Sequence, residues 1–444
     1  PLHVPNPERP TKQFQQKKVP AGPMARAFGF GGMAANVLVS TAGSALSRAV
    51  GGSDGSASAL LTEANANILA DGLCRMRGAG MKIGQMLSMA DESVLPPAIL
   101  DALKRVRDQA DVMLQSQLED VLREELGDDW RSLFAEFSEE PMAAASIGQV
   151  HRAVTHDGRE VAVKVQYPGV AESIDSDLLN LKRLITVADI LPRGLFIDSI
   201  MEVAREELAQ EVDYRIEAEK QREFGRLLAD DEEIVVPDVV DDLSTRRVLT
   251  TTLFPGVPID QVYGLPQEVR DHVARLLLKA TLRELFEFMF LQSDPNSANF
   301  LYDAPSATMA LIDFGAGKRF ERDFMRDYVE LVWASANKDV ATIEEVSIRM
   351  GFLTGDESPD MMKAHLEAGL VVGEPFADDG VFDFKGSGII QRVAKHGDTF
   401  ASQRLTPPPK ASYALHRRLS GCFMACIKLG AKIECRDLLV DYVR

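Results

Sequence analysis

The earliest pattern of apolar residues along the chain is helical. From about Ala59 to Leu126, apolar residues recur every three or four positions, which predicts a series of helices. Pro96 and Pro97 interrupt this series, and its last helix spans Leu114 to Leu126. We therefore expect an all-helical segment over this part of the chain.

The pattern then changes to short strands. Residues 141–165 predict a two-stranded hairpin, with Lys164 on the second strand. A long helical stretch is expected over residues 197–229. Residues 234–237 and 247–254 predict the next two strands of the same small lobe.

The rest of the chain is mostly helical. A helix is predicted from Pro266 to Phe290, and a later apolar strand ends in the sequence Asp313-Phe314-Gly315. Another helical pattern, over residues 324–336, begins almost directly after that strand. A small strand-rich part followed by a helical part predicts an α+β fold with two lobes.

The hairpin carries a sequence pattern known from nucleotide binding. The protein-kinase signature G-x-G-x-x-G-x-V, followed by V-A-I-K, matches it position for position. The three glycine positions, the valine and the lysine fall on Ala143, Ala145, Gly148, Val150 and Lys164. Because Cβ atoms disfavour positive φ and close approach to phosphates, the two alanines predict altered nucleotide binding and slow γ-phosphate transfer.

Two further kinase motifs follow downstream in the expected order. Asp294 and Asn299 keep the spacing of H-R-D-x-x-x-x-N, with Gln292 and Ser293 in place of the His and Arg. The D-F-G motif comes next, at residues 313–315. Together these motifs predict a bilobal protein-kinase-like fold, with a small N-lobe built on an antiparallel sheet and a helical C-lobe.

Three shorter motifs sharpen this interpretation. The first is K-x-G-Q, at Lys82, Gly84 and Gln85. The second is an alanine-rich loop, at Ala143, Ala144, Ala145 and Ser146. The third is E-x-D, at Glu211 and Asp213. With these motifs the chain resembles the UbiB/ADCK (AarF-domain-containing) atypical kinase-like family over about residues 18–444, most closely its coenzyme Q-linked members. The resemblance implies that the helical extension covers the active site. It also implies that the K-x-G-Q motif and the alanine-rich loop restrain protein-kinase activity.

The kinase pattern assigns chemical roles to four residues. Lys164 is expected to bind the non-transferred phosphates of ATP or ADP. Asp294 would accept the proton of an attacking hydroxyl or orient a water. Asn299 and Asp313 offer the oxygen ligands that Mg²⁺ prefers.

A glutamate of the helical stretch is expected to pair with Lys164. Glu217 is the preferred partner, because it lies four residues after Asp213 and shares one helix face with it. Glu211 is the alternative partner. In the preferred arrangement Glu211 and Asp213 are left to meet Lys82, while other acids of this stretch are solvated.

The adenine is expected near the turn formed by Pro255 and Gly256. Backbone groups from Thr252 to Phe254 would bind its edge, although residue type does not specify such contacts. After the D-F-G motif the sequence has no A-P-E and no long activation segment. That segment normally supports a peptide substrate, so its absence argues against ordinary protein phosphorylation.

Composition excludes some classes of function. The chain of 444 residues has a formal net charge of −18, which argues against nucleic-acid binding. Its four cysteines are too few for a disulfide scaffold and fit a reducing compartment. Cys422 and Cys426 lie one helical turn apart, and we interpret them as buried core cysteines rather than as metal ligands.

A membrane contact is expected near the start of the chain. Residues 27–46 carry no charge and are rich in glycine, alanine and other small residues, although they are only mildly apolar. They predict either a membrane-associated segment or a helix packed on the protein's own surface. Family resemblance favours the membrane: the mitochondrial inner membrane on its matrix side in a eukaryote, or the cytoplasmic membrane in a bacterium.

The expected organisation has four parts. Residues 1–55 are a polar lead with the membrane-associated segment, and residues 56–135 are the K-x-G-Q extension. Residues 136–255 form the N-lobe, and residues 256–444 form the C-lobe. The resemblance implies an ATPase that binds Mg²⁺ with ATP or ADP and supports ubiquinone (coenzyme Q) biosynthesis. Its expected partners are membrane lipids, lipid-like coenzyme Q intermediates and coenzyme Q biosynthetic enzymes. A second copy of the chain, in a homodimer, is a further candidate partner. The alternatives are a nucleotide-binding pseudokinase scaffold for those enzymes and a small-molecule or lipid kinase.

Overall fold

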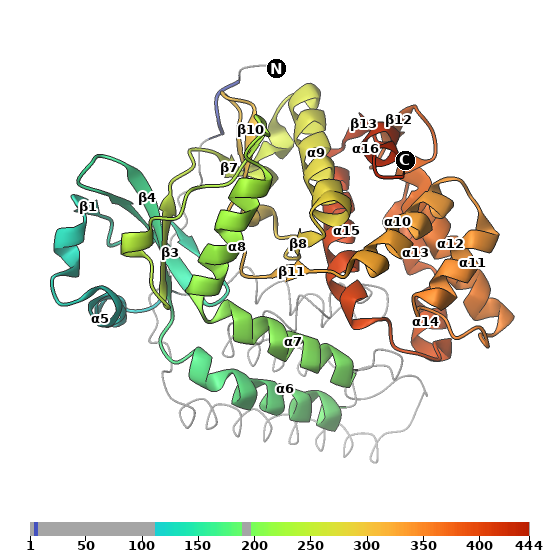
Figure 1. Cartoon of the computed structure of the whole chain (residues 1–444), viewed down its shortest axis with the longest axis horizontal. Coiled ribbons are helices and arrows are strands. Elements are labelled where there is room, and N and C mark those ends of the chain that lie inside the picture. Colours follow the sequence, from blue (N-terminus) through green and yellow to red (C-terminus); the bar gives the residue numbers. More distant parts are fainter. Residues whose placement is uncertain (1–3, 8–111, 189–196, 444) are drawn as a thin grey trace, which may run out of the picture. The chain divides into compact units, whose positions relative to one another are not determined.

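The computed structural model describes residues 4–7, 112–188 and 197–443. Figure 1 labels their helices and strands, and they belong to two units. The N-lobe unit contains the described residues 112–188, 197–215 and 240–251, and the C-lobe unit contains 4–7, 216–239 and 252–443.

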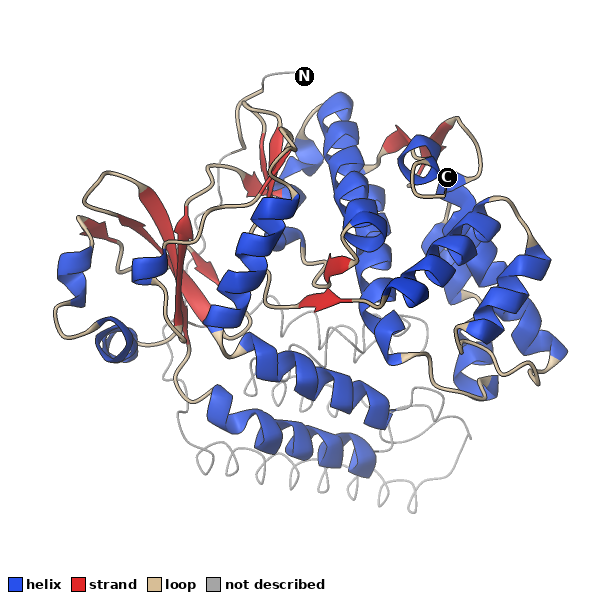
Figure 2. Ribbon diagram, in the orientation of Figure 1, coloured by secondary structure: helices blue, strands red, loops and turns tan. Residues whose placement is uncertain are grey.

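The N-lobe unit is built on a five-stranded sheet, whose strands are drawn in red in Figure 2. Four strands follow the order β1-β3-β4-β6, and β2 also pairs with β3. The strands are β1 (Glu136–Phe137), β2 (Ala143–Ala144), β3 (Gly148–Val154), β4 (Glu160–Gln166) and β6 (Val248–Thr252). The predicted hairpin is confirmed as β3 and β4, which pair antiparallel over seven residues each.

Alternation along β4 explains why this segment forms a strand. Val161, Val163 and Val165 are fully buried, whereas the residues between them are partly exposed. The predicted fourth helix is confirmed as α5 (Gln115–Leu126), which contacts β4. The other helical elements of this unit are η1 (Trp130–Leu133), η2 (Ala171–Ser173), α6 (Ile174–Ala188), α7 (Ile197–Glu211) and η4 (Asp241–Leu243).

The predicted helical stretch over residues 197–229 is confirmed, although a short break divides it. The stretch forms two helices, α7 and α8 (Tyr214–Leu227). Asp213 lies between them, and its Oδ1 accepts a hydrogen bond from Arg215 N at 3.1 Å. An aspartate that accepts a backbone N–H in this way starts a new helix, which explains the break.

The prediction that residues 234–237 form a strand of the small lobe is also wrong. The strand β5 (Ile234–Val235) exists, but it pairs parallel with β10 (Thr308–Leu311) in the C-lobe unit. Ile234 is fully buried in the apolar core of that unit, which explains this placement. The sheet continues through β9 (Phe300–Asp303) and β7 (Val257–Pro258), in the order β5-β10-β9-β7.

The rest of the C-lobe unit is mainly helical. Its central helices are α9 (Gln267–Leu282) and α15 (Lys410–Leu429), which pack against each other in the apolar core, where Cys426 Sγ lies 4.0 Å from Ala274 O. The other helices are α10 (Arg322–Ala336), α11 (Val340–Arg349), α12 (Pro359–Gly373), α13 (Ile389–Ala394), α14 (Gly397–Gln403) and α16 (Arg436–Val440). Short 3₁₀ segments are η5 (Ile259–Gly264), η7 (Ser297–Asn299) and η8 (Glu374–Phe376). Two small strand pairs are β8 (Phe290–Gln292) with β11 (Gly317–Arg319) and β12 (Val381–Asp383) with β13 (Lys432–Glu434).

The predicted helix over residues 266–290 ends early. After α9 the chain forms a π-helical turn, η6 (Arg283–Glu287), and then strand β8. Met289 has a positive φ of 49°, a conformation that cannot continue a helix. Neither Gly nor Pro marks this end, so the sequence pattern continued past it.

Among the described residues, no helix is both long and apolar enough to cross a lipid bilayer. The proposed membrane-associated segment, residues 27–46, lies outside the described residues.

Candidate functional site

The strand lysine is held at the middle of the N-lobe sheet. Lys164 lies on β4 directly opposite Val150 of β3, so the two predicted site residues are cross-strand neighbours. The Lys164 ammonium lies 5.1 Å from the centroid of the Tyr214 ring, within the range of a cation–π interaction. Tyr214 in turn is tied to the sheet region, because its N–H donates to Arg246 O at 2.9 Å.

The alanine-rich loop is a tight turn at the end of the same sheet. Ala143 and Ala144 pair with Val150 and Gln149, and Ala145 N donates to Gly148 O at 2.8 Å. None of these alanines has a positive φ, so the turn uses backbone conformations open to residues with a Cβ. Ser146 lies at the tip of this turn, between Ala145 and Gly148.

Gly148 is the glycine of the signature that the chain retains, and the surrounding atoms explain why. A Cβ at this position would lie 2.5 Å from Val165 O and 2.7 Å from the Tyr214 hydroxyl. The strand can therefore approach β4 and Tyr214 only with a glycine here. This glycine serves close packing inside the N-lobe unit.

Part of the segment expected to bind adenine is already hydrogen-bonded within the protein. Thr252 N donates to Asp238 O, and Thr252 Oγ1 accepts from Asp238 N, each at 2.9 Å. The backbone N–H of Thr252 is therefore already hydrogen-bonded. Base recognition by a backbone N–H would fall to the residues that follow, up to Phe254.

The predicted regulatory residues are only partly described. Lys82, Gly84 and Gln85 lie outside the described residues. Asp213 forms a two-pronged ion pair with Arg215, at 2.9 Å to Nε and 2.6 Å to Nη2. The Arg215 guanidinium hydrogen-bonds Asp213 and so holds the pKa of that carboxyl below its usual value. Glu211 is the last residue of α7.

The catalytic-loop residues lie on one short turn of the C-lobe unit. Asn296 N donates to Asp294 Oδ1 at 3.2 Å, and Asn299 Nδ2 donates to Asp294 O at 3.4 Å. Asn296 also caps η7, since its Oδ1 accepts from Ala298 N. Internal hydrogen bonds thus fix the spacing between Asp294 and Asn299.

The D-F-G segment is joined directly to this turn. Ile312 N donates to Asn299 O at 3.1 Å, and Gly315 N donates to Asp313 Oδ1 at 3.0 Å. Ser293 N and Ser293 Oγ both donate to Ala316 O. The structure therefore brings together three of the predicted residues, Asp294, Asn299 and Asp313, within one hydrogen-bonded pair of loops.

Helix α8 packs on the D-F-G segment. The ring of Phe224 lies 4.8 Å from that of Phe314, which is fully buried. Lys220 Nζ donates to Gly315 O at 3.2 Å. Glu217, the predicted partner of Lys164, lies one turn earlier on α8 and is 2% exposed. Burial of a carboxylate at this depth requires a partner, which fits a role beyond a solvated helix face.

Three residues around the catalytic loop were missed by motif analysis. Arg417 and Arg418 of α15 and Glu284 of η6 are all buried. The signal in the sequence was present: charged residues occur inside the apolar runs RELF and YALHRRLSG. Buried charges are rare unless they are paired, so such positions deserve notice even outside any known motif.

Comparison with known proteins decides the family. The sequence profile of the ABC1 atypical kinase-like domain matches residues 105–347, more than half of the chain. The chain belongs to the ABC1 atypical kinase-like family. This is the UbiB/ADCK family that the motifs resembled, so the predicted family is confirmed.

Members of the ABC1 family match nearly the whole chain. The mitochondrial atypical kinase COQ8B of Rattus norvegicus is 46% identical over 96% of this chain and 81% of its own length. The mitochondrial atypical kinase COQ8 of Saccharomyces cerevisiae is 39% identical over 96% of this chain and 86% of its own length. The chain is thus a COQ8-type atypical kinase, and its predicted involvement in coenzyme Q biosynthesis is confirmed at that level.

A solved structure supports the fold of this ABC1 member. The complex of Rv3197 with erythromycin from Mycobacterium tuberculosis has a TM-score of 0.59 at 26% identity, covering 81% of this chain and 90% of that chain. The predicted kinase-like α+β fold, with an antiparallel N-lobe sheet and a helical C-lobe, is confirmed. A kinase-like fold implies nucleotide binding.

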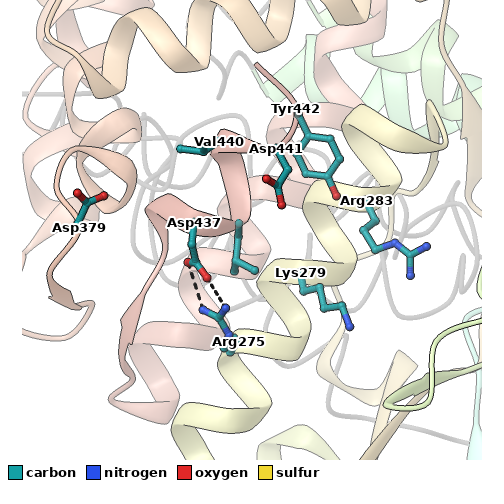
Figure 3. Close-up of a pocket in the computed structure, with 9 residues that line it drawn as sticks. Arg275, Lys279, Arg283, Asp379, Asp437, Val440, Asp441 and Tyr442 are labelled. Carbon is teal, nitrogen blue, oxygen red and sulfur yellow. Dashed lines mark hydrogen bonds and ion pairs between the residues drawn. The ribbon is translucent and has the colours of Figure 1, made fainter. Parts of the chain in front are cut away.

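A separate pocket of about 550 Å³ lies in the C-lobe unit, between α9 and the end of the chain (Figure 3). Its lining residues are Arg275, Lys279, Arg283, Asp379, Asp437, Leu438, Val440, Asp441 and Tyr442. The cations of α9 and η6 in this lining are paired with acids: Arg275 with Asp437, and both Lys279 and Arg283 with Asp231. The pocket contains none of the predicted site residues and offers no unbalanced positive charge to an anion.

The two cysteines of α15 and the one that directly precedes α16 fit the interpretation as core residues. Cys422, Cys426 and Cys435 are buried free thiols. Burial raises the pKa of Cys435 to about 12, which keeps it protonated at neutral pH. Within the described part of the chain, no group of three or more His, Cys, Asp or Glu residues is placed to hold a metal ion.

Proposed function

We propose that this COQ8-type protein is an Mg²⁺-dependent ATPase whose activity supports coenzyme Q biosynthesis at a membrane. The observation that carries the proposal is the retained set Asp294, Asn299 and Asp313 on two hydrogen-bonded loops. A fully degenerate pseudokinase has no need to keep these three residue types at this spacing. The short connection from Gly315 to α10 leaves no long platform for a peptide substrate, which favours water or a small acceptor.

The residues fit the chemistry of phosphoryl transfer. Asp294 orients the attacking water and takes its proton as the bond between the γ-phosphorus and the bridging oxygen breaks. Lys164 and Glu217 are assigned to the non-transferred phosphates and to the orientation of that lysine. Asn299 and Asp313 offer hard oxygen ligands on adjoining loops, which suits Mg²⁺. When bound, Mg²⁺ neutralises charge on the β- and γ-phosphates.

The remaining assignments extend the proposal. The nucleotide contacts are assigned to the turn from Ala143 to Gly148, together with Val150 and the segment from Thr252 to Phe254. Lys82, Gly84, Gln85, Glu211 and Asp213 are assigned a regulatory role, restraining transfer to protein substrates. By analogy with its mitochondrial relatives, we place the protein at the matrix side of the mitochondrial inner membrane in a eukaryote. Membrane lipids and coenzyme Q enzymes or intermediates are its proposed partners.

ATP hydrolysis by the purified protein with Mg²⁺, with and without vesicles of anionic lipid, tests the proposal. We expect turnover that increases with lipid and that falls at least a hundredfold in Asp294→Asn and Asp313→Asn. Asp260→Asn, which changes an exposed carboxylate of η5, is the matched control and should keep wild-type turnover. Hydrolysis that survives in both site variants would show that another site, or a contaminant, is responsible.

A nucleotide-binding scaffold is the second candidate. Two observations favour it: alanine occupies two glycine positions of the loop, and Gln292 and Ser293 replace the His and Arg. A scaffold would bind Mg²⁺ and nucleotide without turnover under any lipid condition. The same experiment, extended with a nucleotide-binding measurement, separates the two candidates.

A further inference from the structure

The catalytic loop is held from outside by helix α15. Arg417 Nε donates to Ser293 O, and Arg417 Nη2 donates to Ser293 Oγ, both at 2.9 Å. Ser293 directly precedes Asp294, and Ser293 Oγ also donates to Ala316 O at 2.8 Å. One guanidinium therefore fixes both the backbone and the side chain of the residue before Asp294.

The neighbouring arginine, Arg418, supports the residue that begins the catalytic loop, Gln292, through Glu284. Arg418 is fully buried and forms a two-pronged pair with Glu284, at 2.8 Å and 3.2 Å. Glu284 Oε2 also accepts a hydrogen bond from Gln292 N at 2.9 Å. Burial raises the pKa of Glu284, and the Arg418 guanidinium opposes that shift.

In a third contact, the backbone of α15 lies close to the catalytic loop. A Cβ added to Gly421 would lie 2.0 Å from Pro295 Cβ, so the helix backbone approaches the residue after Asp294 directly. Contacts from one helix thus reach the residues before and after Asp294. In this sequence the His and Arg of the kinase catalytic loop are absent, and Gln292 and Ser293 occupy those positions.

We propose that Arg417 and Arg418 are positioning residues that hold the Asp294 loop in place of the missing His-Arg pair. Arg417 acts through Ser293, and Arg418 acts through Glu284 and Gln292 N. This inference rests on the proposed ATPase function, because it concerns the aim of the Asp294 carboxylate. Neither arginine is assigned a contact with nucleotide.

The test compares Arg417→Lys with Arg436→Lys. Arg436 is a matched control, because it also donates to backbone carbonyls of the same unit, Phe376 O at 2.7 Å and Ala377 O at 2.9 Å. We expect Arg417→Lys to lower kcat for ATP at least tenfold while KM stays within about twofold, since a lysine cannot form both Ser293 contacts in one plane. Arg436→Lys should change neither parameter.

Hydrogen exchange provides a readout that does not depend on turnover. Amide exchange in the peptide over residues 290–299 should rise at least tenfold in Arg417→Lys and stay at the wild-type rate in Arg436→Lys. If Arg417→Lys does not fold, Ser293→Ala removes the two hydrogen bonds of the hydroxyl, to Arg417 Nη2 and to Ala316 O, but keeps the one from Arg417 Nε to Ser293 O, and should raise the same exchange by a smaller factor.

The outcomes separate this inference from the proposed function. Wild-type exchange in the loop of the Arg417 and Ser293 variants overturns the inference, whether or not the protein hydrolyses ATP. Faster exchange with an unchanged kcat overturns it as well, because the held geometry would then be irrelevant to turnover. Absence of wild-type hydrolysis contradicts the proposed function alone, and exchange still decides whether α15 holds the loop.

Discussion

A fully buried histidine, His151 of β3, is a residue-scale feature that no motif predicted. Its Nδ1 lies 2.8 Å from Ser138 O and its Nε2 lies 2.9 Å from Gln149 Nε2. Gln149 Oε1 accepts from Met113 N, so the amide nitrogen of Gln149 donates to His151 Nε2. His151 Nδ1 then carries the proton that is donated to Ser138 O. The neutral imidazole therefore links three segments of the N-lobe unit.

We predict that His151 makes the stability of the N-lobe unit sensitive to acid. Burial lowers the pKa of His151 to about 4 in the folded state, against about 6.5 in an unfolded chain. Because the folded pKa is depressed, the contribution of His151 to stability is fully present above pH 6.5 and is lost as the pH falls toward 4. By pH 4.5 the loss is about 2–3 kcal/mol.

Denaturant unfolding at pH 7 and pH 4.5 measures this effect. His151→Gln keeps a polar side chain at the site but cannot be protonated. Between pH 7 and pH 4.5, its free energy of unfolding should therefore fall by about 2–3 kcal/mol less than that of the wild type. Equal pH dependence in the two proteins would mean that His151 is not neutral in the folded state.

At the scale of elements, the sequence predicted what depends on local patterns. The hairpin of β3 and β4 follows from alternation and from a tight turn, and α5 follows from apolar spacing. Asp294, Asn299 and Asp313 were found because short loops keep their spacing. The break between α7 and α8 was missed, because a single capping aspartate does not interrupt the apolar spacing.

Contacts between distant segments could not be predicted in the same way. Arg417 and Ser293 are 124 residues apart, and Arg418 and Glu284 are 134 residues apart. No local pattern states which buried arginine meets which carboxylate. The pairing of β5 with the C-lobe sheet could not be predicted for the same reason, since its partner β10 lies more than 70 residues later. Lys82 and its motif remain predictions, because they lie outside the described residues.

The close approach of α15 to the catalytic loop gives a prediction at the element scale. Gly421→Ala places a Cβ against Pro295, so the helix or the loop must move, and we expect a loss of about 1–3 kcal/mol in stability. ATP turnover should fall with it. Thermal or denaturant unfolding of the purified variant, beside a turnover assay, measures both effects.

Gly225→Ala is the matched control for this substitution. Gly225 lies inside α8, where an added Cβ would come no closer than 4.0 Å to Val236 Cβ. An alanine there should be neutral or stabilise the helix by about 0.5–1 kcal/mol. If Gly421→Ala behaves like Gly225→Ala, the tight packing of α15 on the loop is wrong.

At the scale of the whole molecule, the start of the chain is tied to a distant part of the C-lobe unit. Asn6 Nδ2 donates to Asp303 Oδ1 at 2.6 Å, and Asn6 Oδ1 accepts from Ala304 N at 2.8 Å. Val4 packs against the apolar core of the same unit. These contacts join positions almost 300 residues apart and hold the first described residues against the end of β9.

We predict that Asn6→Ala lowers the free energy of unfolding by about 1–3 kcal/mol, because it removes two hydrogen bonds and leaves the largely buried Asp303 with fewer donors. Asn6→Asp should cost at least as much at pH 7, since it brings a second carboxylate against Asp303. Denaturant unfolding of both variants measures this, and wild-type stability in Asn6→Asp would show that the contact does not form.

The distance in sequence between the catalytic loop and the helix that holds it also has a consequence for biosynthesis. A ribosome that adds about 5–20 residues per second needs roughly 6–25 s to travel the 124 residues from Ser293 to Arg417. Once Asp313 has been added, and until Arg417 is reached, the nascent chain carries Lys164, Asp294, Asn299 and Asp313 but lacks the arginines that brace the loop. A premature stop codon in this window would therefore yield a product that looks complete by its motifs and yet has an unbraced catalytic loop.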